Sequence, residues 1–356
     1  MKKIITLFAV ILFGTAAIAQ QLHITQFATL THNDTVTGVW YGAGALNSAY
    51  NSAVAGDVIT LSPGDFNAVT RLNKDITIRG AGMQFDSIAQ TSPSYINGRF
   101  SIEVNSGTLK MEGVYCTADW VVYRTAYSPQ FKKCRFVSLR RPYNNYGGLN
   151  NPIFTNCIIG TWDGSSKAVN AMFINSAILN SMSGTGGMVY DGYTNPSDWY
   201  YSTSTAFGVS SDVYYNCIIG IPPSLTDNKR NIINCITYST NTGQGTAANV
   251  YNTVGITDST DFYANRADHN NSNVHGFESI FKTFRGTYTD GETFELTPQA
   301  AANYLGSDST QVGIYGGSTP YNPKATDMRI QKYAVGFYSD QNGQLQINVT
   351  LDTVSH

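Results

Sequence analysis

Residues 156–160 read Asn-Cys-Ile-Ile-Gly, and residues 216–220 read the same five amino acids in the same order. A shorter copy, Asn-Cys-Ile-Thr, begins at Asn234. Two further copies, beginning at Asn175 and Asn252, keep the asparagine and replace the cysteine with serine or threonine. The cysteines therefore belong to a repeated motif, and this repeat decides the fold.

The repeat has a short and nearly constant period. Its landmarks, counted at the cysteine position, are Cys116, Cys134, Cys157, Ser176, Cys217, Cys235 and Thr253. Successive landmarks lie 18, 23, 19, 41, 18 and 18 residues apart, and the one long step fits a repeat plus an insertion. A constant short period indicates a solenoid. The repeats are rich in Val, Ile, Tyr, Phe and Thr, with Gly and Asn at the breaks, so each repeat consists of short strands.

These features predict an all-β parallel β-helix, in which each coil stacks on the previous one at about 4.8 Å. Asparagine suits the tight turn because it tolerates a left-handed backbone. The cysteines then form a buried ladder of small residues. One disulfide is the alternative, because neighbouring coils would bring Cys116 near Cys134, and Cys217 near Cys235. No CxxC spacing typical of a metal site is present in the sequence.

Composition and charge narrow the range of partners. Only 13% of the 356 residues are charged, about half the usual 25%, which argues against a coiled coil or a charge-rich disordered chain. The chain has 22 basic and 24 acidic residues, a net charge of -2. Without Lys2 and Lys3 the balance is 20 minus 24, or -4. No basic stripe is available to neutralise phosphates, so we expect no nucleic-acid partner.

The amino terminus has the features of a secretory leader. Two lysines follow Met1, residues 4–18 are almost all apolar, and Ala17-Ile18-Ala19 fits a cleavage site. We therefore expect a signal peptide over residues 1–19 and a mature protein that is secreted, periplasmic or on the surface of a bacterial cell. An uncleaved amino-terminal anchor is the alternative. No later stretch reaches the roughly 20 apolar residues of a membrane span, so the mature chain is not expected to be transmembrane.

The first coil carries a different signal. Residues 43–55 place Leu46, Tyr50 and Val54 at four-residue spacing, which predicts a short helix with one apolar face. Such a helix would cover the exposed amino-terminal edge of a stacked β core.

The sequence after this helix resembles a known family. Residues 55–66 read Ala-Gly-Asp-Val-Ile-Thr-Leu-Ser-Pro-Gly-Asp-Phe, and residues 76–82 read Ile-Thr-Ile-Arg-Gly-Ala-Gly. They resemble the opening of pectin-lyase-like right-handed parallel β-helix proteins. With Thr-Gln-Val-Gly-Ile-Tyr-Gly-Gly at residues 310–317, the chain is most similar to uncharacterised secreted β-helix proteins of Bacteroidetes. The resemblance covers about residues 30–320 and implies a right-handed β-helix domain over residues 20–320. It says little about activity, because this fold hosts lyases, hydrolases, esterases, adhesins and phage tailspikes.

Three consecutive repeats place irregular sequence at the same distance from the landmark. Arg140 and Arg141 follow Cys134 by six and seven residues, and Trp162 and Asp163 follow Cys157 by five and six. The insertion, about residues 182–211, begins six residues after Ser176. In the enzymes that the sequence resembles, this side of the coil borders the sugar groove. Long loops gathered on one side of a solenoid usually form the binding surface.

The insertion is rich in aromatic and acidic residues, among them Tyr190, Asp191, Tyr193, Asp198, Trp199, Tyr200 and Tyr201. Aromatic faces pack on sugar rings, and nearby polar groups bind hydroxyls. The alternative is that these rings only hold the insertion against the coil. The candidate glycan-binding residues are Arg140, Arg141, Trp162, Asp163, Tyr190, Trp199 and Tyr200.

The leading interpretation is a secreted protein that binds extracellular polysaccharide through these loops. A polysaccharide lyase is one alternative: Arg140, Arg141 or Lys167 would be the base, and Asp163, Asp191 or Asp198 would bind calcium. An ordinary ion pair between Arg140 or Arg141 and Asp163 accounts for the same residues. A glycoside hydrolase would need clustered aspartates, which form no motif here. A structural or adhesive surface protein is the other alternative. We assign no catalytic residue and no cofactor.

Two further segments complete the interpretation. His269 and His275, with Asp268, could ligate a metal, although such an Asn-rich stretch is more typical of a solvated loop. Residues 321–356 follow the last coil, and within them 329–337 and 344–351 predict a β-hairpin. It could cap the lower edge of the solenoid or act as a sorting or docking segment.

Overall fold

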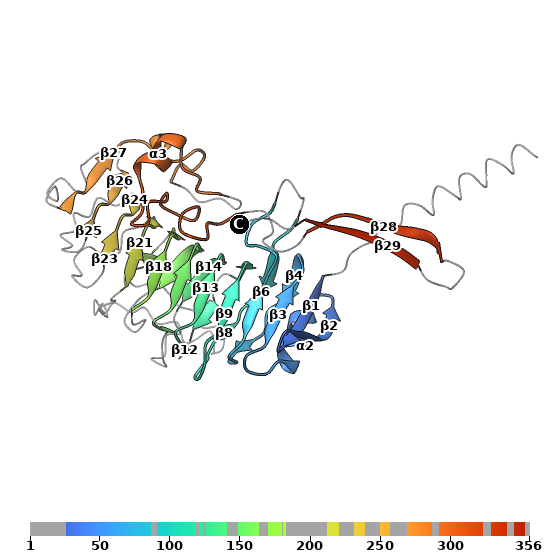
Figure 1. Cartoon of the computed structure of the whole chain (residues 1–356). Helices are drawn as coiled ribbons and strands as arrows, with labels where there is room; N and C mark the ends of the chain where they lie inside the picture. Colours follow the sequence, from blue (N-terminus) through green and yellow to red (C-terminus); the bar gives the residue numbers. More distant parts are fainter. Residues whose placement is uncertain are drawn as a thin grey trace, which may run out of the picture.

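The protein is a parallel β-helix, as the repeat predicts (Figure 1). The computed structural model describes residues 26–86, 91–118, 121–123, 126–140, 149–163, 170–179, 181–182, 212–220, 231–238, 250–256, 269–286, 292–322, 329–339 and 345–352. Two long sheets run side by side along the molecule, and the apolar core lies between them.

The first sheet has 11 strands in the order β2-β1-β3-β6-β9-β13-β16-β18-β21-β23-β25. The bounds are β1 (Phe27–His32), β2 (Thr35–Tyr41), β3 (Val58–Leu61), β6 (Thr77–Arg79), β9 (Lys110–Glu112), β13 (Gln130–Lys132), β16 (Ile153–Thr155), β18 (Met172–Ile174), β21 (Val213–Tyr215), β23 (Asn231–Ile233) and β25 (Val250–Tyr251). From β3 onward every pair is parallel, whereas β1 pairs antiparallel with both β2 and β3. The hairpin β1–β2 therefore ends this sheet at its amino-terminal side.

The second sheet has 14 strands, and its main path is β27-β26-β24-β22-β19-β17-β14-β10-β7-β4. The bounds are β4 (Gly64–Asn67), β7 (Ser94–Asn97), β10 (Val114–Cys116), β14 (Arg135–Arg140), β17 (Ile158–Asp163), β19 (Ala177–Ile178), β22 (Ile218–Ile219), β24 (Ile236–Tyr238), β26 (Val254–Ile256) and β27 (Ser272–Val274). Beside this path lie β5 (Arg71–Leu72), β8 (Ser101–Ile102), β11 (Val121–Tyr123) and β20 (Ser181–Met182). A separate small sheet pairs β12 (Ala126–Tyr127) with β15 (Leu149–Asn150).

The asparagine of the repeat makes the turn between the two sheets. Asn156 and Asn216 have left-handed φ angles of 52° and 56°. The same conformation occurs at the equivalent positions Gly113, Lys133, Asn175, Asn234, Asn252 and Asn270. Asparagine and glycine tolerate this conformation best, so the coil turns where the motif begins.

The cysteine of the repeat forms a hydrogen-bonded ladder inside the turn. The backbone N–H of Cys217 donates to Sγ of Cys235 (3.3 Å), and that of Cys235 donates to Oγ1 of Thr253 (3.3 Å). The N–H of Thr253 in turn donates to Oδ1 of Asn271 (2.9 Å). Every occupant of this chain of bonds carries an accepting atom on its side chain, so Cys, Ser, Thr and Asn are interchangeable here. All five cysteines are buried and free, and Cys134, Cys157, Cys217 and Cys235 lie at equivalent positions, which confirms the ladder interpretation over a disulfide for these four.

Cys116 is not a rung of this ladder, and the sequence alignment is wrong at this point. Strand β10 pairs with β14 through Tyr115↔Arg135 and Cys116↔Phe136. Val114 is therefore the equivalent of Cys134, and the true step is 134 minus 114, or 20 residues. The turn residue of this coil is Gly113, which does not stand out as a landmark as an asparagine does.

The last three residues of the motif have separate roles. Ile159 and Ile219 point into the main core between the sheets, whereas Ile158 and Ile218 belong to a second apolar cluster. A Cβ at Gly160 would overlap the carbonyl oxygen of the neighbouring coil's Val137, and one at Gly220 would overlap that of Leu179. Glycine is therefore required because the backbones approach too closely for any side chain.

A stack of aromatic rings fills the centre of the main core. Phe131, Phe154, Phe173 and Tyr214 lie at registered positions on four neighbouring strands, with ring centroids 4.8, 4.9 and 4.8 Å apart and planes within 16° of parallel. The centroid spacing equals the distance between hydrogen-bonded strands, about 4.8 Å, so the rings stack coil upon coil.

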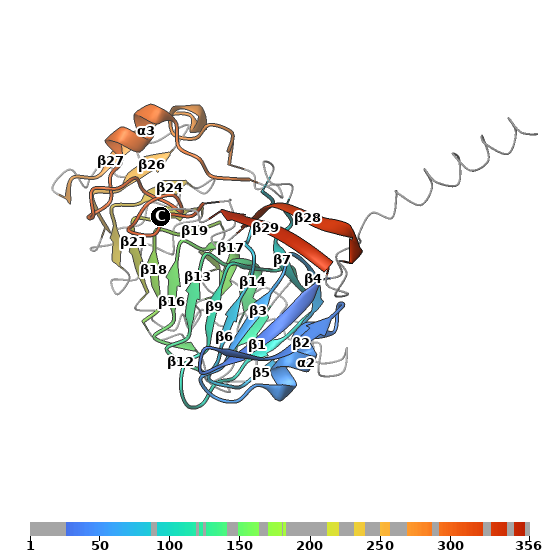
Figure 2. The same ribbon diagram turned by 45° about the vertical axis from the view of Figure 1, so that its right-hand side comes forward.

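The chain after the last coil folds back over the outer face of the 14-stranded sheet. We call residues 277–322 the strap; it includes η3 (Phe277–Ser279) and α3 (Pro298–Asn303). In Figures 1 and 2, α3 lies above β24 and β26. Apolar strap residues close the second cluster against the outward isoleucines of the sheet: Ile280, Phe281, Phe284, Phe294, Leu296, Val312 and Ile314. The glycine-rich motif at residues 310–317 is thus part of the strap and forms no coil.

Two hydrogen bonds from one turn asparagine fix the strap in place. Asn156 Nδ2 donates to the carbonyls of Ile314 (2.8 Å) and Gly316 (2.9 Å). The N–H of Gly313 donates to the carbonyl of Asn216 (2.8 Å). The left-handed backbone of these asparagines thus forms the turn of the coil. In addition, the side chain of Asn156 and the carbonyl of Asn216 form hydrogen bonds with the strap.

The amino-terminal helix is shorter than predicted. Helix α2 covers Ala45–Ser52 and buries Leu46 and Tyr50, as expected. Ala53 is extended, so Val54 lies outside the helix and is 54% exposed. The expected third apolar position was wrong because the helix ends before it.

The carboxyl-terminal hairpin is confirmed. Strand β28 (Arg329–Ser339) pairs antiparallel with β29 (Leu345–Asp352). The two strands form a sheet of their own and pair with no strand of the solenoid. In Figures 1 and 2 they lie toward the end that carries β1 and β4, away from β25 and β27. Among the described residues, no helix has the length and apolar character needed to cross a membrane.

Candidate functional site

The candidate site is the side of the solenoid where three neighbouring strands end. Leu139 of β14 pairs with Trp162 of β17, and Trp162 pairs with Ser181 of β20. The three strands end at or next to these residues, so the chain leaves the sheet at adjacent points in three successive coils. The repeat spacing predicts this alignment, and we call it the loop side.

Arg140 and Asp163 are the last residues of their strands. Each directly follows the pair Leu139↔Trp162, so their backbones are neighbours, as expected for residues that could form an ion pair or share a ligand. Their side chains lie outside the described part of the structure. The remaining candidates from the sequence also lie outside the described residues: Arg141, Lys167, Tyr190, Asp191, Tyr193, Asp198, Trp199, Tyr200 and Tyr201.

Trp162 is not a glycan-binding residue. Its side chain is fully buried and packs edge-to-face against Phe154 (5.5 Å) and Phe173 (5.3 Å) of the aromatic stack. Neither face of the indole is available to a sugar. Strict alternation from Ile159 would turn Trp162 outward, so its burial is a departure from the simple two-residue period of a strand.

Asp212 is a residue at this site that sequence reasoning missed. It is fully buried, accepts the indole N–H of Trp162 (3.1 Å) and accepts the backbone N–H of Ala171 (3.3 Å). It stands directly before β21, at the carboxyl end of the insertion. The available signal was the tryptophan itself, because a buried indole N–H needs an acceptor. Asp212 therefore anchors the base of the insertion to the core.

Three of the buried cysteines are poor nucleophiles. Burial raises the pKa of the Cys116, Cys134 and Cys217 thiols well above the ordinary value, and neighbouring thiols raise it further. These side chains stay protonated at neutral pH, whereas the thiolate is the reactive form.

The predicted histidine site is divided between described and undescribed residues. The ring of His269 packs against Tyr251 at 4.5 Å, and its carbonyl accepts the N–H of Asn252 (3.0 Å), so His269 belongs to the last coil. Asp268 lies outside the described residues. Within the described ranges, no three His, Cys, Asp or Glu side chains come together as metal ligands would.

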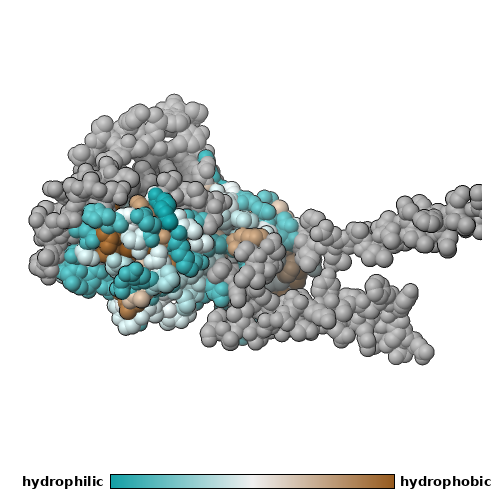
Figure 3. Space-filling view, turned by 90° about the horizontal axis from the view of Figure 1, so that it is seen from above, coloured by the Kyte–Doolittle hydropathy of each residue, from teal (hydrophilic) through white to brown (hydrophobic). Residues whose placement is uncertain are grey.

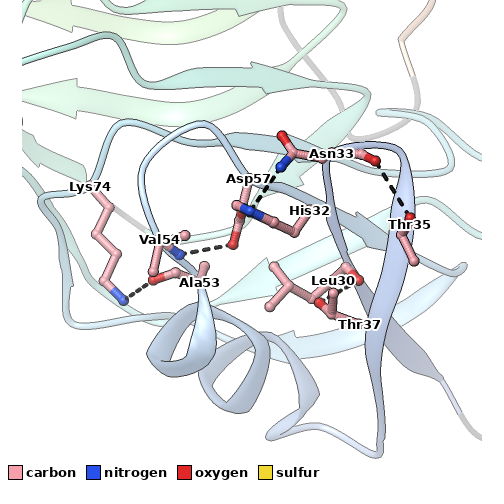
Figure 4. A network of polar contacts seen from close by, with 9 residues as sticks. All are labelled: Leu30, His32, Asn33, Thr35, Thr37, Ala53, Val54, Asp57 and Lys74. Atoms are coloured by element: carbon pink, nitrogen blue, oxygen red, sulfur yellow. Dashed lines mark hydrogen bonds and ion pairs between the residues drawn. The ribbon is translucent and has the colours of Figure 1, made fainter.

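A polar network at the amino-terminal end is well ordered but has a structural role (Figure 4). His32 Nδ1 lies 2.5 Å from Oδ1 of the buried Asp57, whose Oδ2 accepts the N–H of Val54 (2.8 Å). The side-chain amide of Asn33 lies 3.1 Å from His32 Nε2. The second imidazole nitrogen thus bonds an amide rather than a serine or cysteine. This network fastens the β1–β2 hairpin to the end of α2.

Most of the residues that are coloured in Figure 3 are hydrophilic, and the hydrophobic spots among them are small and separated from one another. On the outer face of the 11-stranded sheet, Glu112 lies between Arg79 (4.0 Å) and Lys132 (3.4 Å), all partly exposed. Such pairs contribute at most about 1 kcal/mol and do not by themselves make a site.

Comparisons with protein-family models, curated proteins and solved structures find no significant match to this chain. The structure itself defines the class, which is a parallel β-helix protein with one strapped face and one loop side.

Proposed function

We propose that the protein binds an extracellular polysaccharide on its loop side. The observation that carries the proposal is the alignment of the ends of β14, β17 and β20. Because the chain leaves the sheet at three adjacent points, the segments that follow begin close together. In sequence they carry Arg141, Tyr190, Trp199 and Tyr200. Aromatic rings and polar groups brought together in this way are suited to sugar rings and their hydroxyls.

The architecture also favours a long ligand. Coils that repeat about every 4.8 Å give an extended surface along the solenoid axis, which fits a polymer better than a compact metabolite. The apolar leader at residues 1–19 supports a site of action outside the cytoplasm, where such polymers occur.

Retention on immobilised polysaccharides tests the proposal. We expect the protein to be retarded by at least one member of a panel of acidic and neutral glycans. Trp199→Ala and Arg141→Ala should weaken the retention roughly tenfold, because each removes a proposed contact. Tyr251→Ala is the matched control: it removes a partly exposed ring on β25 of the other long sheet, so retention should be unchanged. Loss of retention with Tyr251→Ala but not with Trp199→Ala or Arg141→Ala, or no retention on any glycan, would refute the proposal.

The same incubations distinguish binding from cleavage. Ultraviolet absorbance of unsaturated uronates that needs calcium and disappears with chelator would identify a lyase, with Arg140, Arg141 and Lys167 as the residues to substitute. New reducing ends without absorbance would identify a hydrolase. Retention without either signal leaves a binding protein.

A further inference from the structure

Strand pairing in the 11-stranded sheet stops, within the described residues, at the amino-terminal end of the solenoid. Strand β2 is the edge of the 11-stranded sheet, and among the described residues it pairs with β1 alone. Its sequence, Thr-Val-Thr-Gly-Val-Trp-Tyr, contains no charged residue and no proline. Helix α2, which the sequence predicted as the cover of this end, packs against β2 and β1, and among the described residues no strand pairs with the outer edge of β2.

The side chains of this strand are unusually apolar for an exposed edge. Val36 is 58% exposed, Val39 43% and Tyr41 71%. Edge strands of soluble proteins are normally guarded by lysine, proline, a bulge or a covering segment, because free N–H and C=O groups pair with other chains. The guard present here is one bulge at Thr37, where the register with β1 shifts. Residues 38–41 keep a regular register with β1.

We propose that β2 is a self-association edge, on which two copies of the chain pair β2 to β2 in antiparallel orientation. In an antiparallel pair of identical strands, a residue near the two-fold axis faces its own copy and the other residues face different positions of the same strand, so a strand with charges of one sign would repel itself. An uncharged strand with exposed Val39 and Tyr41 avoids this repulsion and buries apolar area instead. The antiparallel direction continues the pairing of β1 with β2.

The other end of the sheet does not offer an equivalent partner. It ends in β25, which has two residues and pairs in parallel with β23. Joining β2 to β25 would give an open filament, whereas joining β2 to β2 closes after two copies. The expected assembly is an end-to-end dimer with one continuous sheet.

Sedimentation velocity of the purified protein over a range of concentrations tests the proposal. We expect the wild type to sediment as a monomer–dimer equilibrium at micromolar concentrations. Val39→Lys should raise the dimer dissociation constant at least tenfold, since it places like charges near each other across the axis. Val54→Lys is the matched control, because it adds the same charge at an exposed valine outside the strand β2. A wild type that stays monomeric, or a Val39→Lys variant that dimerises unchanged, overturns the proposal.

A cross-linking experiment covers the case in which Val39→Lys does not fold. The native thiols are buried, so a cysteine introduced by Val39→Cys would be the accessible one. A short bismaleimide should give a covalent dimer with Val39→Cys and none with Val54→Cys. Equal cross-linking of both variants would place the contact elsewhere and contradict the proposal.

Discussion

At the scale of single residues, the turn position after each asparagine is selected for an accepting side-chain atom. Cys235 shows the rule: its Sγ accepts from the N–H of Cys217, and its own N–H donates to Thr253. Both N–H groups are buried, so each needs a partner. The recurring cysteine is thus explained by hydrogen bonding as much as by size, and the other occupants of the position follow from it.

This rule predicts an unequal effect of two substitutions at one site. Cys235→Thr should change the free energy of unfolding by less than about 1 kcal/mol, because Thr253 fills the same position in the next coil. Cys235→Ala should cost about 1–3 kcal/mol, since it leaves the N–H of Cys217 buried without an acceptor. Urea unfolding followed by circular dichroism checks both. Equal losses would show that only side-chain volume matters at this position.

The buried thiols also predict how stability depends on pH. Burial raises the pKa of Cys116, Cys134 and Cys217 above the ordinary value of 9.0. Above that pH the unfolded chain releases these protons while the folded chain retains them, so the folded state binds more protons and stability falls as pH rises. Below pH 9 this contribution is complete. Each thiol should cost about 1.4 kcal/mol per pH unit above 9.

Urea midpoints measured between pH 7 and pH 10.5 test this dependence. The double variant Cys134→Ser, Cys217→Ser should show a shallower decline, because serine does not titrate in this range. Buried Tyr238 and Tyr321, whose pKa values burial also raises, would add to the slope above their ordinary value of 10.0 in both proteins. An identical slope in variant and wild type would contradict the assignment to the thiols.

At the scale of the element, the last residue of the motif must be glycine, because the backbone of the neighbouring coil lies too close for a side chain there. Gly160→Ala and Gly220→Ala should each destabilise the protein by several kcal/mol, because the new Cβ overlaps the carbonyl of Val137 or Leu179 and a backbone cannot move aside cheaply. Gly44→Ala is the control, since a Cβ there meets open space. Thermal unfolding should show a large drop in melting temperature for the first two variants only.

The elements show how far the sequence predicts this fold. The period of the landmarks predicted the coil neighbours from Cys134 to Thr253. Each coil uses the same turn conformation, so the same motif recurs in the amino-acid sequence. The period misplaced Cys116, because the glycine turn at Gly113 resembles no landmark. The sequence interpretation placed Trp162 among the exposed glycan-binding candidates. Its burial was not predicted, because Asp212, which accepts the indole N–H, lies 50 residues later in the sequence. The strap was unpredictable for the same reason, since its contacts follow no period.

At the scale of the whole molecule, the strap makes one face of the solenoid part of the interior. Outward residues such as Ile158 and Ile218 would face water in an unstrapped solenoid, yet here they are buried under Phe281 and Ile314. The loop side, where β14, β17 and β20 end, is a different side of the same coils. A repeat protein normally depends only on contacts between neighbouring coils, and the strap adds contacts that span several of them.

Removal of one strap ring tests the importance of this second cluster. Phe284 is fully buried and contacts Tyr238, Phe281 and Phe294 at centroid distances of 5.0–5.3 Å. Phe284→Ala should lower the free energy of unfolding by about 3–5 kcal/mol. It should also increase binding of a hydrophobic dye, because the outer isoleucines become accessible. Tyr251→Ala, at a partly exposed ring outside the cluster, should change little. Similar losses in both variants would contradict a special role for the strap.

The strap also imposes an order of events on the folding chain. Contacts between coils join residues such as Cys217 and Cys235, 18 positions apart, whereas Asn156 must wait for Ile314, 158 positions later. Closing so distant a loop is slow, and a chain made from its amino terminus delivers those residues late. Until the strap residues are synthesised and docked, outward isoleucines such as Ile158 and Ile218 are exposed to solvent. The folding intermediate without the strap is therefore prone to aggregation. Intermediates of different chains must be kept apart until the strap has docked.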